Sequence, residues 1–120
     1  MTVDPFAERL ARVRQRFVAG LEGNIEDTYK AIPDLLESAP ARVEAVEATY
    51  RRIHSLVGIG PTVGFARTGR AARSVENILI PSQQAKRGLT NQEIDSFKKA
   101  LHVLRETAAN ELQMFYSTWR

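Results

Sequence analysis

The fold is decided most clearly by residues 90–119, which read TNQEIDSFKKALHVLRETAANELQMFYSTW. The stretch begins with a capping box, in which the Thr90 hydroxyl accepts a hydrogen bond from the backbone N–H of Glu93 and the Glu93 carboxylate accepts one from the N–H of Thr90. Apolar residues then recur at steps of three and four, the period of one helix face. They are Ile94, Phe97, Leu101, Leu104, Ala108, Leu112, Phe115 and Trp119. The stretch therefore predicts an amphipathic helix over residues 91–118.

The same period runs through the first third of the chain. Asp4 followed by Pro5 is typical of a helix start, with a capping carboxylate before a proline at the first helical position. The apolar stripe that follows stays in phase, which predicts one long helix over 5–37 that Pro33 kinks near its end. Its members are Phe6, Leu10, Val13, Phe17, Leu21, Ile25, Thr28, Ile32 and Leu35.

Two shorter helices are predicted between these long ones. The break at residues 38–40 is followed by expected helices over 40–60 and 65–79, and residues 80–89 are expected to form a loop. Since no strand-like alternation occurs, the predicted fold class is all-α, an antiparallel up-down four-helix bundle of one domain over residues 1–120. The residues expected in its core are Phe17, Ile25, Val46, Ile53, Leu56, Val75, Phe97, Leu101 and Leu104.

Composition narrows the classes of function. The 120 residues include no cysteine, which excludes disulfides, thiolate zinc sites and a cysteine nucleophile. No apolar run is long enough to span a membrane, and the N-terminus lacks the basic start and apolar run of a signal peptide. We therefore expect a cytoplasmic location and no membrane association. The formal charge of +3, carried mostly by arginine, suits an acidic or phosphorylated partner.

The most informative polar residue is His54, in the predicted second helix. On a helical wheel it lies roughly 100° from the apolar centre, at the flank of the core. Its ring should lean toward the N-terminus, over Tyr50 and Arg51. Gly58 leaves open the space one turn above the ring, although glycine in a helix costs about 1 kcal/mol relative to alanine. An open approach to the imidazole by another protein's active site is one reason to keep it.

These residues resemble a known family. His54-x-Leu56-x-Gly58, followed by Val63-Gly64, is similar to the motif of histidine-containing phosphotransfer (HPt) domains of bacterial two-component phosphorelays. The resemblance covers nearly the whole chain and is greatest to the chemotaxis-kinase type. The chain's last helix ends without a stop signal, so it could be part of a longer signalling protein.

The resemblance implies a function and a site. His54 would accept a phosphoryl group, and Glu76, 22 residues later, would hydrogen-bond its other ring nitrogen, with Arg73 one turn before Glu76 as further support. Tyr50, Val57, Gly58 and Gly64 would form the docking surface. The implied partners are the receiver domain of a response regulator and a sensor or hybrid histidine kinase. Such a phosphocarrier needs no cofactor or metal of its own, because magnesium comes from the receiver, and it has no autonomous catalytic site.

The chain departs from the family pattern at Val57, where the family has a lysine that helps to neutralise the phosphoryl group. Arg51, on the same face, could supply that charge instead, as could Arg67, Arg70 or Arg73. Because of this departure, an alternative function stays open, in which a degenerate bundle docks a receiver or kinase without phosphotransfer.

Other interpretations give these residues no role in phosphotransfer. Glu76 could be a solvated helix residue, the arginines could form a solvated face, and His102 is interpreted as structural. A basic helical module that binds nucleic acid is a further alternative, although the sequence offers few lysines or exposed aromatics for it.

Overall fold

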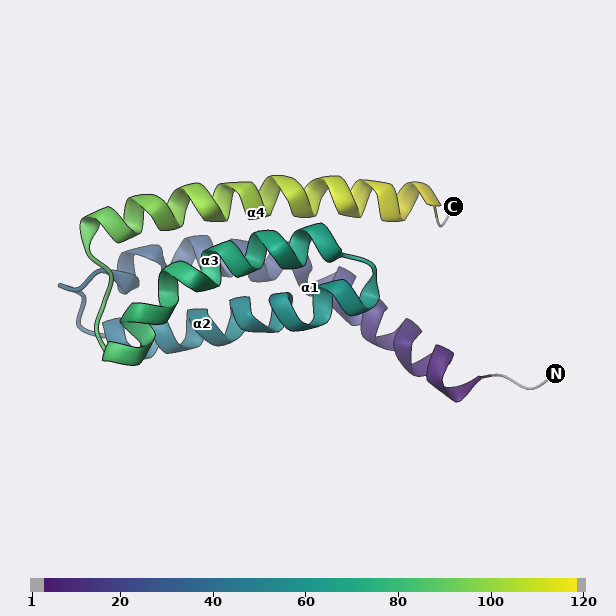
Figure 1. Cartoon of the computed structure of the whole chain (residues 1–120), viewed down its shortest axis with the longest axis horizontal. Helices are drawn as coiled ribbons and strands as arrows, with labels where there is room; N and C mark the ends of the chain where they lie inside the picture. Colours follow the sequence, from purple (N-terminus) through teal and green to yellow (C-terminus); the bar gives the residue numbers. More distant parts are fainter. Residues whose placement is uncertain (1–3, 119–120) are drawn as a thin grey trace.

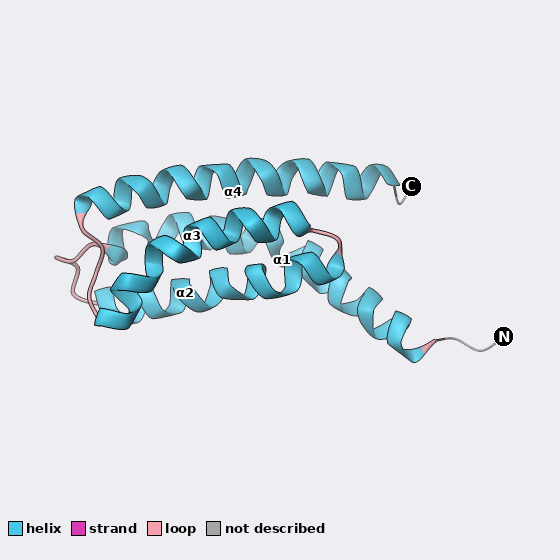
Figure 2. Cartoon of the chain, in the orientation of Figure 1, coloured by secondary structure: helices cyan, strands magenta, loops and turns pink. Residues whose placement is uncertain are grey.

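The computed structural model describes residues 4–118, which form four α-helices (Figure 1). These are α1 (Pro5–Leu35), α2 (Arg42–Ile59), α3 (Ala66–Ala85) and α4 (Asn91–Thr118), and a short 3-10 helix, η1 (Gly60–Val63), joins α2 to α3. Figure 2 shows only helices and loops over this part of the chain, so the prediction of an all-α fold is confirmed. No helix among these residues combines the length and apolar character that crossing a membrane would require.

The helices pack in a ring around a shared core. Helix α1 contacts α2 and α4, and α3 contacts the same two helices from the other side. All nine residues predicted for the core are buried, so that prediction is confirmed. Phe65, Ala72, Val75 and Leu79, which follow one another at helical spacing at the start of α3 and along it, are also buried. The three-and-four spacing identified these positions because each helix has one apolar face, and burial of those faces drives folding.

Both predicted helix starts are present. The Asp4 carboxylate accepts a hydrogen bond from the backbone N–H of Phe6 at 2.9 Å, at the start of α1. In the capping box of α4, the Thr90 hydroxyl accepts from the N–H of Glu93 at 3.1 Å. The Glu93 carboxylate accepts in return from the N–H of Thr90 at 2.9 Å. Each bond satisfies a backbone donor that the helix itself leaves unpaired.

The prediction that residues 80–89 form a loop is wrong for its first half. Helix α3 continues through Pro81 to Ala85. Pro81 lies on the exposed side of the helix, while its neighbour Ser82 is fully buried and donates a hydrogen bond to the carbonyl of Gly88 at 3.3 Å. A proline ring removes one helical hydrogen bond. Burial on the opposite side therefore keeps the last turn helical, and the helix ends at Lys86 in the left-handed conformation.

The first predicted helix also needs a correction at each end. Phe6, the first residue of the predicted stripe, is 65% exposed. The N-terminal turns of α1 project beyond the other helices, so they have little to pack against (Figure 1). At the other end, α1 stops at Leu35 rather than at residue 37. Trp119, the last residue of the predicted α4 stripe, lies outside the described residues.

The α1–α2 and α3–α4 connections pair with each other at one end of the molecule. The N–H of Leu89 donates to the carbonyl of Leu35 at 2.7 Å, and the N–H of Glu37 donates to the carbonyl of Leu89 at 3.1 Å. A Cβ atom at Gly88 would lie 2.5 Å from the Glu37 Cα atom. The close approach of these two backbones therefore requires glycine at this position.

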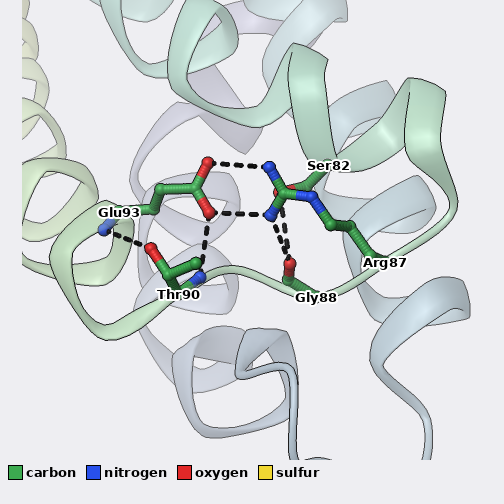
Figure 3. Close-up of polar contacts among 5 residues, drawn as sticks. All are labelled: Ser82, Arg87, Gly88, Thr90 and Glu93. Carbon is green, nitrogen blue, oxygen red and sulfur yellow. Dashed lines mark hydrogen bonds and ion pairs between the residues drawn. The ribbon is translucent and has the colours of Figure 1, made fainter.

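A polar network centred on Arg87 fastens the same connection (Figure 3). One guanidinium nitrogen donates to the Ser82 hydroxyl at 2.9 Å, to the carbonyl of Gly88 at 2.8 Å and to Glu93 at 2.8 Å. The other donates to Glu93 at 3.2 Å. The hydrogen bond from Arg87, followed by those from Thr90, lowers the pKa of Glu93 to about 2. Because donors and acceptors are matched here, the network holds the start of α4.

Candidate functional site

His54 lies on α2 with 63% of its side chain exposed to solvent. Tyr50, one turn earlier on the same helix, places its ring beside the imidazole. The two ring centroids are 5.5 Å apart and the planes differ by 15°, a stacked arrangement. This follows from helix geometry, because a side chain leans toward the turn that precedes it. Tyr50 therefore covers one face of the imidazole and limits its rotation.

Glu76 reaches the same imidazole from α3. It is 4% exposed, and its Oε2 atom accepts a hydrogen bond from Nδ1 of His54. A buried carboxylate needs such a donor, since an unpaired charge away from water is costly. The bond fixes the tautomer with the proton on Nδ1. The lone pair of Nε2 is then the nucleophilic position of the ring.

The glycines around His54 divide into two kinds. A Cβ atom at Gly58 would meet nothing within 4 Å, so packing within this chain does not require glycine there. At Gly60 a Cβ atom would lie 3.0 Å from the carbonyl oxygen of Phe65, where η1 turns into α3. Gly64 has φ of +92°, in the left-handed region that favours glycine. The local backbone geometry therefore accounts for glycine at positions 60 and 64, whereas nothing within this chain accounts for glycine at position 58.

The predicted supporting arginines do not contact the imidazole. Arg51 is exposed and its Nε atom donates to Glu47 at 3.2 Å, an i,i+4 pair on the surface of α2. Glu47 also accepts from Gln83 of α3 at 3.1 Å. Arg73 is exposed, and the structure records no ion pair for it among residues 4–118. Val57 is half-buried against the edge of the core.

His102 has a different environment. It is exposed on α4, and its Nε2 atom lies 3.9 Å from Glu106, which is itself exposed. Its Nδ1 atom lies 3.3 Å from a guanidinium nitrogen of Arg105. A solvated carboxylate at that distance does not fix the orientation of a ring as a buried, hydrogen-bonded one does. The two histidines therefore differ in how firmly each imidazole is held.

Some contacts between and along the helices were not predicted from the sequence. The Glu111 carboxylate of α4 accepts from the backbone N–H and the hydroxyl of Thr68, at 2.6 and 2.7 Å. This caps α3, which has no side-chain cap of its own. Contacts between residues 43 positions apart leave no local signal in a sequence. The Arg51–Glu47 pair, by contrast, could have been predicted from its i,i+4 spacing.

Comparison with known proteins adds no further identification. No family model, curated protein or solved structure matches this chain. Among residues 4–118, no group of three or more histidine and carboxylate side chains is placed to hold a metal ion.

Proposed function

We propose that this protein is a histidine phosphotransfer protein of a two-component phosphorelay, with an antiparallel up-down bundle as its scaffold. His54 carries the phosphoryl group between a kinase or receiver aspartate and a response regulator. The observation that supports this most strongly is the exposed imidazole whose Nδ1 atom is hydrogen-bonded to a buried carboxylate. A surface histidine without a function has no need of such a partner.

The transfer follows from the tautomer. The Nε2 lone pair attacks the phosphorus of an aspartyl phosphate, an N–P bond forms, and the P–O bond to the aspartate breaks to release its carboxylate. Nδ1 keeps its proton and its hydrogen bond to Glu76. The ring gains positive charge as the N–P bond forms, and the Glu76 carboxylate stabilises that charge. The reverse sequence returns the phosphoryl group to a second aspartate.

The exposed surface beyond His54 also affects which partner domains can approach the imidazole. Gly58 is exposed one turn beyond His54, and no packing contact within the chain requires glycine there. The receiver's active site, which supplies its own magnesium, would enter over this position. Tyr50 and Val57 would border the same docking surface.

A second candidate function is docking without transfer. Val57 stands where the resembling family has a lysine, and Arg51 is engaged with Glu47 rather than free to meet a phosphoryl group. A bundle of this kind would bind a receiver or kinase and occupy it without accepting phosphate.

Phosphotransfer from a panel of radiolabelled receiver domains tests the proposal. Wild type should acquire acid-labile, base-stable label. His54→Gln, which keeps size and polarity, should acquire none, while His102→Gln serves as the matched control and should be labelled as wild type is. Label that survives His54→Gln would end the proposal. Absence of label on wild type, with receiver binding intact, would favour docking without transfer.

A further inference from the structure

The segment of sequence that contains His54 is strongly basic. Residues 48–75 contain five of the 17 basic residues and none of the 14 acidic ones. The rest of the chain therefore has 12 basic and 14 acidic residues, a formal net charge of −2, so the segment alone makes the protein basic. The five basic residues are Arg51, Arg52, Arg67, Arg70 and Arg73.

Three of these arginines form a row on α3. Arg67, Arg70 and Arg73 follow one another at steps of three, and all three are exposed. No ion pair involves them within the described residues, whereas Arg51 and Arg87 each have a carboxylate partner. Exposed arginines that form no ion pair within their own chain can meet negative charge on another molecule.

The row begins at the phosphoacceptor site and runs away from it. Arg73 lies one turn before Glu76, whose carboxylate holds His54. At a rise of about 1.5 Å per residue, Arg70 and Arg67 lie about 9 and about 13 Å along α3 from Glu76. These distances are too long for Arg70 and Arg67 both to reach a phosphoryl group on His54. They also exceed the Debye length of about 8 Å at physiological ionic strength, so these arginines would act on the part of a docked protein that lies over α3 itself.

We propose that the arginine row extends the docking surface around His54 toward an acidic face of the partner protein, and that it accelerates association without taking part in phosphoryl transfer. This inference rests on the proposed function, since the partner is the one that exchanges phosphate with His54. Complementary charge of this kind mainly raises the association rate and makes it dependent on salt. A protein partner is favoured over nucleic acid because no exposed aromatic residue lies along the row to stack on bases.

The test compares two charge reversals of equal size on exposed helical positions. Arg67→Glu/Arg70→Glu changes the row, and Lys98→Glu/Lys99→Glu on α4 is the matched control. Association with fluorescently labelled receiver domains is followed by stopped flow at several salt concentrations. The row variant should lose roughly tenfold or more in association rate at low salt, together with most of the salt dependence. The control should change far less, and the maximal transfer rate at saturating receiver should remain within about twofold of wild type for both.

Several results would overturn the inference. Two are kinetic: equal association rates for the row variant and its control, and association that is insensitive to salt. The other two concern the partner: no association with any receiver in the panel, and tighter binding of the row to duplex DNA or RNA than to the receivers. Failure of the proposed function is separate, because it would appear as receiver association that depends on the row while His54 accepts no label.

Discussion

The carboxylates of Glu93 and Glu76 each accept a hydrogen bond from a basic side chain, and the two pairs differ in whether the basic side chain keeps a nitrogen available for reaction. At the α3–α4 connection, Glu93 accepts from Arg87 and from Thr90, and Arg87 also donates to the Ser82 hydroxyl and the Gly88 carbonyl (Figure 3). On the α2–α3 face, Glu76 holds one nitrogen of His54 and leaves the other on an exposed ring. The first pair joins groups that hold the α3–α4 connection, whereas the second leaves Nε2 of an exposed ring available, which is what the proposed phosphotransfer requires.

The largest effect should come from removing the charge on Glu76. Glu76→Gln keeps the size of the side chain but no longer stabilises the positive charge that forms on the ring, so transfer should slow by roughly 10- to 100-fold. Ring-nitrogen NMR shifts should also show loss of the single Nδ1–H tautomer, which a purely structural role would not alter. Glu106→Gln, beside His102, is the control. Equal transfer rates in the two variants would contradict the role given to Glu76.

The α3–α4 connection and helix α2 predict opposite effects for glycine substitution. Gly88→Ala places a methyl group against the Glu37 backbone and should lower the free energy of unfolding by about 2 kcal/mol or more. Gly58→Ala meets nothing and should raise it by about 0.5–1 kcal/mol, because glycine is a poor helix former. Urea denaturation measures both, and a destabilised Gly58→Ala would show that packing requires this glycine.

A larger side chain at Gly58 should separate folding from docking. Gly58→Leu should leave the helix content and the unfolding midpoint close to those of wild type, since the site faces open space. It should nevertheless slow transfer from a receiver by about tenfold or more, because the side chain fills the approach to His54. Transfer at the native rate would mean that the open space has no steric role.

The capping network should respond to acid. The pKa of Glu93 is lowered from 4.5 to about 2, so its ion pair contributes stability above pH 4.5 that is lost as the pH falls toward about 2. After allowance for solvent screening, the contribution should be about 1–2 kcal/mol. Denaturation of Glu93→Gln should show less pH dependence over this range than wild type. An unchanged pH profile would mean that the ion pair does not stabilise the fold.

The smallest effects should come from charges near the phosphoryl group. Arg51→Ala should slow transfer by roughly two- to fivefold, since the residue is exposed and partly neutralised by Glu47. Val57→Lys restores the charge found in the resembling family and should speed transfer by a similar factor. Single-turnover rates with one labelled receiver measure both, and a Val57→Lys variant slower than wild type would contradict this assignment.

How far the sequence predicted the structure depends on the range of each contact. The core stripe and the Thr90–Glu93 capping box rest on neighbouring positions within one helix, and both predictions are confirmed. The loop predicted after Leu79 is wrong because a local signal, Pro81, was outweighed by burial of Ser82 on the other side. Phe6 was misplaced because periodicity does not show where the neighbouring helices end.

Predictions for the candidate site also depended on how far apart the contacting residues lie in the sequence. Exposure of His54 at the flank of the core follows from the position of one residue on a helix. Its contact with Glu76 was expected only from the resemblance, because residues 22 positions apart give no local signal. The cap that Glu111 provides for α3 could not be expected at all, since it depends on how α3 and α4 pack.

The proposed function requires that Glu76 holds Nδ1 of His54 so that Nε2 carries the phosphoryl group. The most direct test is two-dimensional NMR of the protein with nitrogen-15 in its histidine rings, recorded after phosphorylation by a small-molecule phosphoramidate or by a receiver. The expected result is a phosphorus–nitrogen coupling on Nε2 of His54, with Nδ1 still protonated. Phosphate on Nδ1, or on His102 instead of His54, would contradict it.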